Sequence, residues 1–486
     1  MKDFSKITEE LAVLQERTDW AQGTERIGRL LEKHGAELDR GEKSFLYGRL
    51  GYFLRFLERA EESAAAYREA VLYAPYLAQQ RKLYSDYLLI CHYLPHVSDE
   101  ELAESHFFYQ NFFRPKEELQ HVRDDHRRHS KIRIGYLSSN FKTHIMSCFM
   151  MQLLALADRD RFEVYCYDLG GLSDGAAEQM KSFGNIWRNI ALPEAKERAR
   201  TIAADEIDIL FDLGVHTDGG HGLATLGYKA APVQIAGIGY MSTSGLKAVD
   251  YYLSDRFLDP PGKGDAYFSE KLLRLSHSHF CYTPFEEIFK STIDWQPHER
   301  PVFGCFNNSA KISEEMLRLW LTLLRRVPGA KLLLKAWKPE ALLEKALSLG
   351  YCRGEIEVRP MTLDYVHEYM DMDIALDTFP YTGGGTTCEA IYMGVPVVTL
   401  AGTRHGTRFG LSLLENVGLG ELVSNTPEEY VEKAAALASD AELLAALHKN
   451  LRPMMQRSPV MDGKSYVREI EAMYEDVWQA WLDGRE

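Results

Sequence analysis

Short apolar segments that alternate with helical stretches dominate the chain from Lys131 onward. The first series contains KIRIGYLSSN, FEVYCYDLG, IDILFDLG and PVQIAGIGY, and the second contains PVFGCFNNSAKIS, AKLLLK, EIEV, DIALDTFP and VPVVTL. This alternation is typical of a parallel sheet wound with helices. A stretch rich in Pro, His and charged residues, from Phe280 to Pro301, separates the two series. The pattern therefore predicts an α/β protein with two doubly wound, Rossmann-like domains that face each other across a cleft.

The chain before these series predicts helices only, because its apolar residues recur at spacings of three and four. Counting a tetratricopeptide unit of about 34 residues from Ser44 places its signature positions on Tyr47, Leu50, Gly51, Leu54, Ser63, Tyr67, Ala70 and Pro75. One such unit cannot bury its own faces, so we expect flanking helices at Ile7 to Leu14 and Leu77 to Leu94 to complete a small stack. The expected domains are a helical domain at 1–125, a first Rossmann-like domain at 126–290, and a second at 291–486 that includes the C-terminal helix.

Composition narrows the class of protein. The 486 residues include 71 acidic and 56 basic side chains, and this net charge of −15 argues against a nucleic-acid partner. The seven cysteines are scattered without CxxC pairs, which predicts neither a disulfide framework nor a structural metal and suits a cytoplasmic protein. We expect no signal peptide, since the first residues form a polar amphipathic pattern, and no apolar run approaches the ~20 residues of a membrane span.

A glycine-rich turn in the second series predicts a phosphate site. Gly383, Gly384 and Gly385 follow an apolar strand, and Thr386 and Thr387 open the next helix. Glycines leave backbone N–H groups uncovered at a helix N-terminus, where the macrodipole favours an anion. A tight strand-to-helix turn also uses glycine for steric reasons alone. A P-loop is excluded because no Lys follows the glycines, so the pattern favours a phosphate or diphosphate without ATPase chemistry.

Other polar residues of the second domain are expected near the same phosphate. Asn307 and Asn308 end the strand that starts at Val302, and Lys311 follows them. Lys311 is either a solvated side chain or a cation that balances the charge on a diphosphate leaving group. Glu389 lies one turn into the glycine-loop helix. Its carboxylate is either stabilised there by the helix dipole alone or accepts hydrogen bonds from ribose hydroxyls.

Two histidine-bearing loops of the first domain are expected to converge on the cleft, because each follows the carboxyl end of a strand. They carry His144 and His216. A structural cap is the alternative role for His144.

Arg408 is expected on the rim of the phosphate site. Asp371 and Asp373 spell the DxD of some metal-dependent sugar transferases, but Asp373 directly precedes a strand, so we assign no metal site.

Five motifs occur together in an order and spacing that resemble bacterial relatives of the protein O-GlcNAc transferases. They are SSNFKTHIMS, KAAPVQIAGIGYMSTSGLKAVDYYLSD, CFNNSAKIS, DIALDTFPYTGGGTTCEAIYMGVPVVTLAG and RHGTRFGLSLLENVGL. The resemblance covers about residues 131–481, and the tetratricopeptide-like helices suit the same family. It implies a GT-B enzyme that binds UDP-GlcNAc in its second Rossmann-like domain and transfers the sugar, with inversion and without a metal, to Ser or Thr of a protein. Flagellin or another surface protein is the candidate acceptor.

The resemblance also implies roles for residues at matching positions. His144 matches a cleft histidine proposed as base or acceptor contact, Lys311 the lysine on the diphosphate, and Glu389 the acid that holds the ribose. Asn308 matches a neighbouring polar donor-site position. The phosphate-binding turn contains Gly384, Gly385, Thr386 and Thr387.

The sequence departs from the family pattern at three places. Gly384 or Gly385 stands where the family often has a His, Tyr365 stands for the His that packs on the uracil, and GYMST stands for GYPGT. A tyrosine keeps a stacking face but changes the hydrogen bonding. Two other functions remain open at this point, namely an enzyme that glucosylates Asn from UDP-glucose, and an inactive scaffold that only binds.

Overall fold

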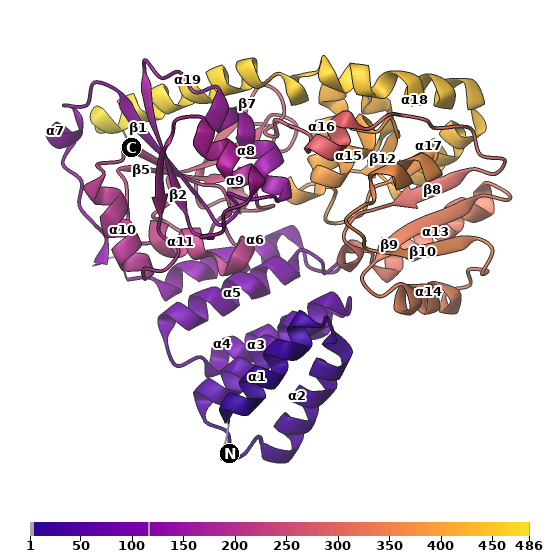
Figure 1. The fold of residues 1–486 in the computed structure, drawn as a ribbon, viewed down its shortest axis with the longest axis horizontal. Coiled ribbons are helices and arrows are strands. Elements are labelled where there is room, and N and C mark those ends of the chain that lie inside the picture. The colour runs from indigo at the N-terminus through magenta and orange to yellow at the C-terminus, as the bar shows by residue number, and fades with distance from the viewer. Residues whose placement is uncertain (1–3, 115–116, 486) are drawn as a thin grey trace.

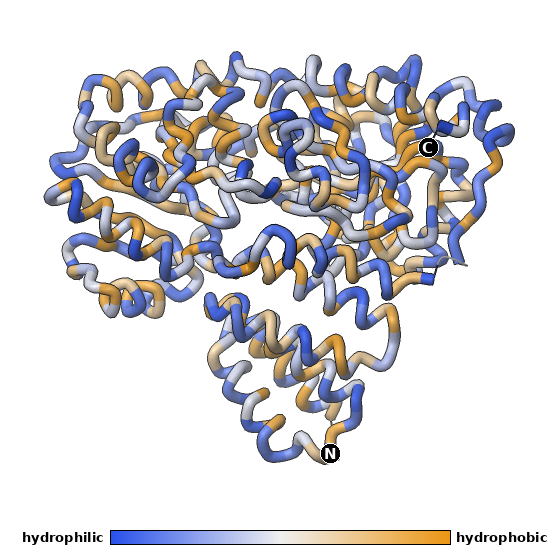
Figure 2. The backbone as a smooth tube through the Cα atoms, turned by 180° about the vertical axis from the view of Figure 1, so that it is seen from behind, coloured by the Kyte–Doolittle hydropathy of each residue, from blue (hydrophilic) through white to orange (hydrophobic). Residues whose placement is uncertain are grey.

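The computed structural model describes residues 4–114 and 117–485, which form a helical domain followed by two α/β domains (Figure 1). The helical domain contains α1 (Phe4–Glu16), α2 (Trp20–His34), α3 (Arg40–Phe56), α4 (Ala60–Tyr73), α5 (Leu77–Cys91) and α6 (Asp99–Phe107). Capping boxes start α3 at Asp39 and α6 at Ser98, where each side chain accepts a backbone N–H three residues on. Figure 2 shows hydrophobic and hydrophilic residues interleaved along these helices, as amphipathic packing requires.

The tetratricopeptide-like pairing of α3 with α4 is confirmed. A Cβ atom on Gly51 would lie 2.8 Å from the Tyr67 ring, so the two helices can approach this closely only with glycine at that position. Ser63 Oγ donates a hydrogen bond to the Gly51 carbonyl at 2.7 Å across the same contact. α4 ends at Tyr73, two residues before Pro75.

The first α/β domain contains a seven-stranded parallel sheet with strand order β3-β2-β1-β4-β5-β6-β7. Its strands are β1 (Ile132–Ser138), β2 (Phe162–Asp168), β3 (Ile186–Asn189), β4 (Ile209–Asp212), β5 (Val233–Gly237), β6 (Tyr251–Asp255) and β7 (Lys271–Leu275). The helices of this part of the chain are α7 (Arg123–His126), α8 (Ile145–Ala155), α9 (Gly175–Ser182), α10 (Ala195–Ala204), α11 (His221–Leu226) and α12 (Glu286–Lys290). The strand order reverses direction between β1 and β4, which creates a crevice beyond the carboxyl ends of these strands.

The second α/β domain repeats this design with six strands in the order β10-β9-β8-β11-β12-β13. Its strands are β8 (Val302–Cys305), β9 (Lys331–Ala336), β10 (Ile356–Pro360), β11 (Ile374–Leu376), β12 (Val397–Leu400) and β13 (Val423–Ser424). The helices are α13 (Glu314–Arg326), α14 (Pro339–Ser348), α15 (Gly385–Tyr392), α16 (Phe409–Val417), α17 (Pro427–Ser439) and α18 (Ala441–Gln456). The order reverses between β8 and β11, so the segments that carry Asn307 and the glycine turn leave neighbouring strand ends.

The last helix, α19 (Gly463–Leu482), packs on the first α/β domain, although its sequence position assigns it to the second. Figure 1 shows α18 and α19 running along one side of both domains. The Tyr474 hydroxyl of α19 lies 3.2 Å from that of Tyr136 in β1, and a Glu471 oxygen accepts the Asp158 amide at 2.7 Å. The apolar side of α19 therefore completes the core of the first domain, and the chain crosses between the domains twice.

The helical domain contacts both α/β domains. Ser85 Oγ of α5 lies 2.9 Å from His216 Nδ1 in the first, and Arg404 Nη1 of the second donates to the Val97 carbonyl at 3.2 Å. A polar contact thus joins the helical domain to each α/β domain, buried in the first case and partly buried in the second. Within the described ranges, none of the helices combines the length and apolar character that crossing a bilayer requires.

Candidate active site

A cavity of about 610 Å³ lies between the two α/β domains and contains most of the predicted site residues. The first domain contributes His144, Ile145 and Tyr240 to its lining, and the second contributes the start of α15, the carboxyl end of β9 and the segments after β8 and β10. The predicted residues that line it are His144, Asn307, Asn308, Lys311, Tyr365, Gly384, Gly385, Thr386 and Glu389. Predicted residues from four separate segments therefore meet at one place, which is large enough for a ligand of nucleotide size.

The Asp377 carboxylate fixes the conformation of the glycine turn through hydrogen bonds. One carboxylate oxygen accepts the amides of Thr378 and Gly383 at 2.9 and 2.7 Å, and the other accepts Thr399 Oγ1 at 2.7 Å. Burial raises the pKa of Asp377 to about 6. The hydrogen bonds and the charge of Lys311 lower this pKa and so oppose the effect of burial. This support fixes the backbone of the turn. Gly385 and Thr386 line the cavity at the start of α15, where the first N–H groups of a helix have no acceptor within it.

Side chains around the turn leave little room for anything but glycine. A Cβ atom on Gly385 would lie 2.3 Å from Ile145 Cγ1, at the start of α8. Thr386 Oγ1 donates to Asn307 Oδ1 at 2.7 Å. The start of α15 thus packs directly against the start of α8 from the opposite domain, and two helix N-termini converge on the cavity.

Lys311 supplies a cation opposite the turn. Its Nζ donates to the Thr382 carbonyl at 3.1 Å and lies 3.5 Å from the centre of the Tyr381 ring. Burial lowers the pKa of Lys311 to about 8, and the nearby Asp377 carboxylate raises it. Lys311 and the start of α15 therefore line the same cavity.

Glu389 and Tyr365 form the next part of the cavity. The Tyr365 hydroxyl donates to one carboxylate oxygen of Glu389 at 2.9 Å, and Tyr369 donates to the other at 3.1 Å. Burial raises the pKa of Glu389 to about 7, and both tyrosine hydrogen bonds lower it. Each carboxylate oxygen can accept a second hydrogen bond, so Glu389 can still bind a ligand hydroxyl.

His144 caps α8 and faces the cavity. Its Nδ1 accepts the Met146 amide at 3.2 Å. In the neutral imidazole the proton therefore lies on Nε2, which makes that nitrogen a donor. Desolvation lowers the pKa of His144, and Asp218 raises it. In this tautomer His144 can donate a hydrogen bond to a ligand oxygen but cannot take its proton.

Four predicted residues lie outside the cavity lining, and one of them is Gly383, whose amide donates to Asp377. His216 is fully buried, with its two ring nitrogens 2.9 Å from Ser85 Oγ and from the Ser244 carbonyl oxygen. The expectation that the loops of His144 and His216 converge on one cleft is therefore corrected, because α5 covers His216. Arg408 donates to the carbonyls of Phe257 and Gly402 at 2.9 and 2.8 Å instead of facing the rim of the phosphate site.

Thr387 also turns away from the cavity, since its Oγ1 donates to the Gly383 carbonyl at 3.1 Å. The Asn307 and Asn308 side chains are partly used within the protein. Asn307 Nδ2 donates to Asp377 at 3.3 Å, and Asn308 Oδ1 accepts the Ala310 amide at 3.1 Å. Both asparagines thus shape the segments that line the cavity.

Sequence reasoning missed two kinds of residue in the cavity. Lys335 lines it from the end of β9, and its place at the carboxyl end of a parallel strand is the signal that could have identified it. Phe280 lines it beside Gly384 and stacks on Phe149, with 4.2 Å between ring centres. Nothing in the sequence distinguishes these phenylalanines from other core residues.

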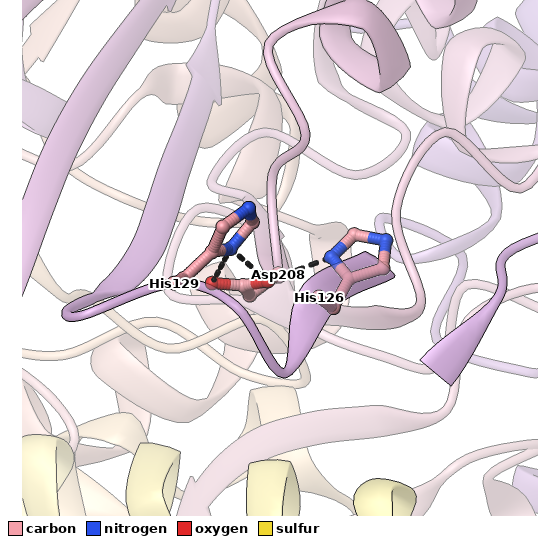
Figure 3. A group of neighbouring side chains, drawn as sticks. All are labelled: His126, His129 and Asp208. Carbon is pink, nitrogen blue, oxygen red and sulfur yellow. Dashed lines mark hydrogen bonds and ion pairs between the residues drawn. The ribbon is translucent and has the colours of Figure 1, made fainter. Parts of the chain in front are cut away.

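A separate group of side chains lies before β1 and β4. Figure 3 shows His126 and His129 directed toward Asp208, with Nδ1 to Oδ1 distances of 2.7 and 3.0 Å. Their ligand atoms lie within 4.8 Å of one another, a spacing that a metal ion can use. Asp208 also accepts the Arg133 amide at 2.7 Å. The carboxylate therefore ties the segment before β1 to the sheet, away from the cavity.

Two Rossmann-like domains with a cavity between them and a glycine turn at a helix start define the GT-B class of fold. The sequence profile of glycosyl transferase family 41 matches residues 111–294 and 283–470. The chain belongs to this family.

The chain is 36% identical over 425 residues to a protein of Hordeum vulgare named probable UDP-N-acetylglucosamine–peptide N-acetylglucosaminyltransferase SPINDLY, a match that spans 82% of this chain and 43% of the relative. It is 28% identical over 377 residues to the SEC protein of Arabidopsis thaliana, which carries the same enzyme name, across 73% of this chain and 38% of the relative. The chain thus spans less than half the length of these curated relatives.

Among solved structures, a lysine-to-methionine variant of the O-GlcNAc transferase of Thermobaculum terrenum matches with a TM-score of 0.83 and 27% identity, across 100% of this chain and 99% of that chain. The match includes the helical domain as well as both α/β domains.

Proposed function

We propose that the protein is an inverting, metal-independent glycosyltransferase that moves GlcNAc from UDP-GlcNAc to Ser or Thr of a protein acceptor. One observation carries the proposal: the amides at the start of α15 and the Lys311 ammonium face the same cavity, beside Glu389 and Tyr365. This arrangement suits a diphosphate, a ribose and a base in sequence. The family to which the protein belongs and the names of its relatives support the choice of donor and acceptor.

In the proposed reaction the acceptor oxygen bonds to the anomeric carbon while the bond from that carbon to the diphosphate oxygen breaks. UDP leaves with the electron pair, and the hydroxyl proton passes to water. Lys311 and the α15 amides stabilise the charge that grows on the leaving diphosphate, without reorganising during the reaction. His144 Nε2–H lies on the acceptor side and orients the hydroxyl, which lowers the entropic cost of attack.

The test is incubation of the protein with UDP-GlcNAc and candidate bacterial proteins, flagellin included, followed by peptide mapping. The proposal expects a mass increment of one GlcNAc on Ser or Thr, undiminished by a chelator. A donor panel of UDP-glucose and GDP-sugars, read by release of the nucleoside diphosphate, checks the choice of donor. Modification of Asn would replace the proposal with an N-glucosyltransferase, and tight UDP binding without transfer or hydrolysis would replace it with a binding scaffold.

We also propose that the protein acts in the cytoplasm. The described cysteines are all free, and six of the seven are buried. This state suits a reducing compartment. Fractionation of the native host is the direct check, and recovery of the activity outside the cytoplasm would contradict it.

A further inference from the structure

Lys335 is a buried ammonium that faces the cavity. Only 2% of the residue is exposed, and it lines the cavity at the carboxyl end of β9. Removing a charged amine from water costs several kcal/mol unless partners replace the lost hydration. A buried lysine at a ligand cavity therefore needs an explanation beyond packing.

The partners of Lys335 leave one donor for a ligand. Its Nζ donates to Thr362 Oγ1 at 3.0 Å and is paired with the Glu368 carboxylate. An ammonium has three N–H groups, so these two partners use two of them. Glu368 also accepts Arg359 Nη1 at 3.0 Å, which means that its charge is shared between two cations.

The position of Lys335 relative to the other cavity residues indicates which part of the donor it meets. Its Nζ lies 5.9 Å from the centre of the Tyr365 ring and 5.4 Å from that of Phe306. Tyr365 in turn holds Glu389, the residue that we propose for the ribose. For a nucleotide with its diphosphate at α15 and its ribose at Glu389, Tyr365 and Lys335 are therefore the next side chains available to the base.

We propose that Lys335 determines the base specificity of the donor by donating a hydrogen bond to a carbonyl oxygen on the base, O4 of uracil or the corresponding O6 of guanine. This inference rests on the proposed function. An ammonium can only donate, so a base with an amino group at that position leaves the buried donor unpaired and brings two donors together. Sites built to hydrogen-bond a substrate group reject analogues that lack it far more strongly than apolar pockets do.

The test compares bases of equal ring size by calorimetric titration with UDP, CDP, GDP and ADP. We expect UDP to bind at least about tenfold more tightly than CDP, the effect of about one hydrogen bond, and GDP to bind more tightly than ADP. In Lys335→Met the UDP-to-CDP affinity ratio should fall to within about twofold, because the apolar chain cannot distinguish the two groups. Binding of inorganic pyrophosphate should not change, since the phosphate site is separate.

Two further variants make the result decisive. Lys331→Met alters an exposed lysine at the other end of the same strand and should keep the wild-type ratio. Lys335→Gln keeps a polar group, and because its amide can present either a donor or an acceptor, its ratio should also approach one. Glu368 retains Arg359 in both Lys335 variants, so we expect both to fold.

The outcomes separate the two proposals. A folded Lys335→Met or Lys335→Gln protein that keeps the wild-type UDP-to-CDP ratio overturns the role of Lys335 alone. So does equal affinity of the wild-type protein for UDP and CDP. A wild-type protein that binds none of the four nucleotides overturns the proposed function and this inference with it.

Discussion

Lys311 is the residue on which the proposed chemistry depends most. Lys311→Ala should reduce kcat by about 10²–10³-fold, the usual cost of removing one preorganised group that stabilises transition-state charge. Steady-state release of UDP measures this, and Lys331→Ala, which removes an exposed lysine of the same domain, is the matched control. A folded Lys311→Ala enzyme with full activity would remove this lysine from the mechanism.

The buried carboxyl group of Glu389 lowers the free energy of unfolding at high pH. Burial raises its pKa from 4.5 to about 7, so between these values the folded protein keeps a proton that the unfolded chain releases. The contribution of this group to the free energy of unfolding therefore falls as pH rises through this range. Glu389→Gln cannot ionise and should stabilise the protein at about pH 8 by on the order of 2 kcal/mol, but much less near pH 5.

Thermal unfolding of wild type and Glu389→Gln at the two pH values measures this difference. The variant should bind the donor more weakly at the same time, because a neutral amide accepts ribose hydroxyls less well than a carboxylate. Equal stabilisation by Glu389→Gln at both pH values would show that burial does not raise the pKa of Glu389.

At the residue scale the sequence could predict the side chains whose role depends on local position. Gly384, Thr386 and Lys311 lie in the segments that come after β11 and β8, and parallel strands bring such segments to one edge of the sheet. His216 has the same local signal, yet Ser85 from α5 covers it. Because α5 lies more than a hundred residues before His216 in the sequence, no local pattern could predict that this helix packs over the histidine.

At the scale of elements, the starts of α8 and α15 meet at the cavity, where Ile145 leaves no room for a Cβ atom on Gly385. A methyl group on Gly385 would clash with Ile145, 2.3 Å away, and would push the two helix starts apart. We expect Gly385→Ala to lower kcat/KM by about tenfold or more, since misplacement of a binding group by about 1 Å can cost up to 10²-fold. Steady-state kinetics with UDP-GlcNAc and acceptor measure the loss.

Two variants control this experiment. Ile145→Ala combined with Gly385→Ala removes the clashing atoms and should recover part of the activity. Gly354→Ala adds a methyl group where no atom lies within 4 Å and should have no effect. Full activity of Gly385→Ala alone would mean that the two domains can separate without cost.

The sequence predicted four strands of the first sheet (β1, β2, β4 and β5) and five of the second (β8 to β12), but it missed β3, β6, β7 and β13. β1, β4 and β8 are largely buried and therefore appear as apolar runs. β3 and β7 lie at the two edges of the first sheet, and most of their residues are at least partly exposed. Their mixed composition resembles that of loops, so hydrophobic periodicity alone could not identify them.

At the scale of the whole molecule, buried histidines join the helical domain to the α/β domains. His106 Nε2 of α6 lies 2.8 Å from the hydroxyl of Tyr240, which lines the cavity, and His92 and His216 are buried nearby. Burial lowers the pKa of His106 to about 4 and those of His92 and His216 well below the usual value of 6.5. The unfolded chain therefore binds protons below about pH 6.5 that the folded interface cannot take up.

The stability supplied by this interface should consequently fall as pH drops from about 7.5 to 5. His106→Phe, which cannot titrate, should be less stable at neutral pH but should lose less of its Tm over the same pH range. Thermal unfolding at both pH values tests this. A pH-dependent loss as large in His106→Phe as in wild type would show that His106 does not contribute to it.

The arrangement of the three domains was only partly predictable. The alternation of strands and helices indicated two Rossmann-like domains, but the return of α19 to the first domain depends on tertiary packing of Tyr474 on Tyr136. An amphipathic helix carries no signal that says which core it covers.

A crystal structure of the protein with bound UDP would locate the diphosphate. We expect it at the start of α15, with phosphate oxygens within hydrogen-bonding distance of the Gly385 and Thr386 amides and of Lys311 Nζ. A diphosphate bound elsewhere, or a complex in which protein side chains fill this corner of the cavity, would contradict this expectation.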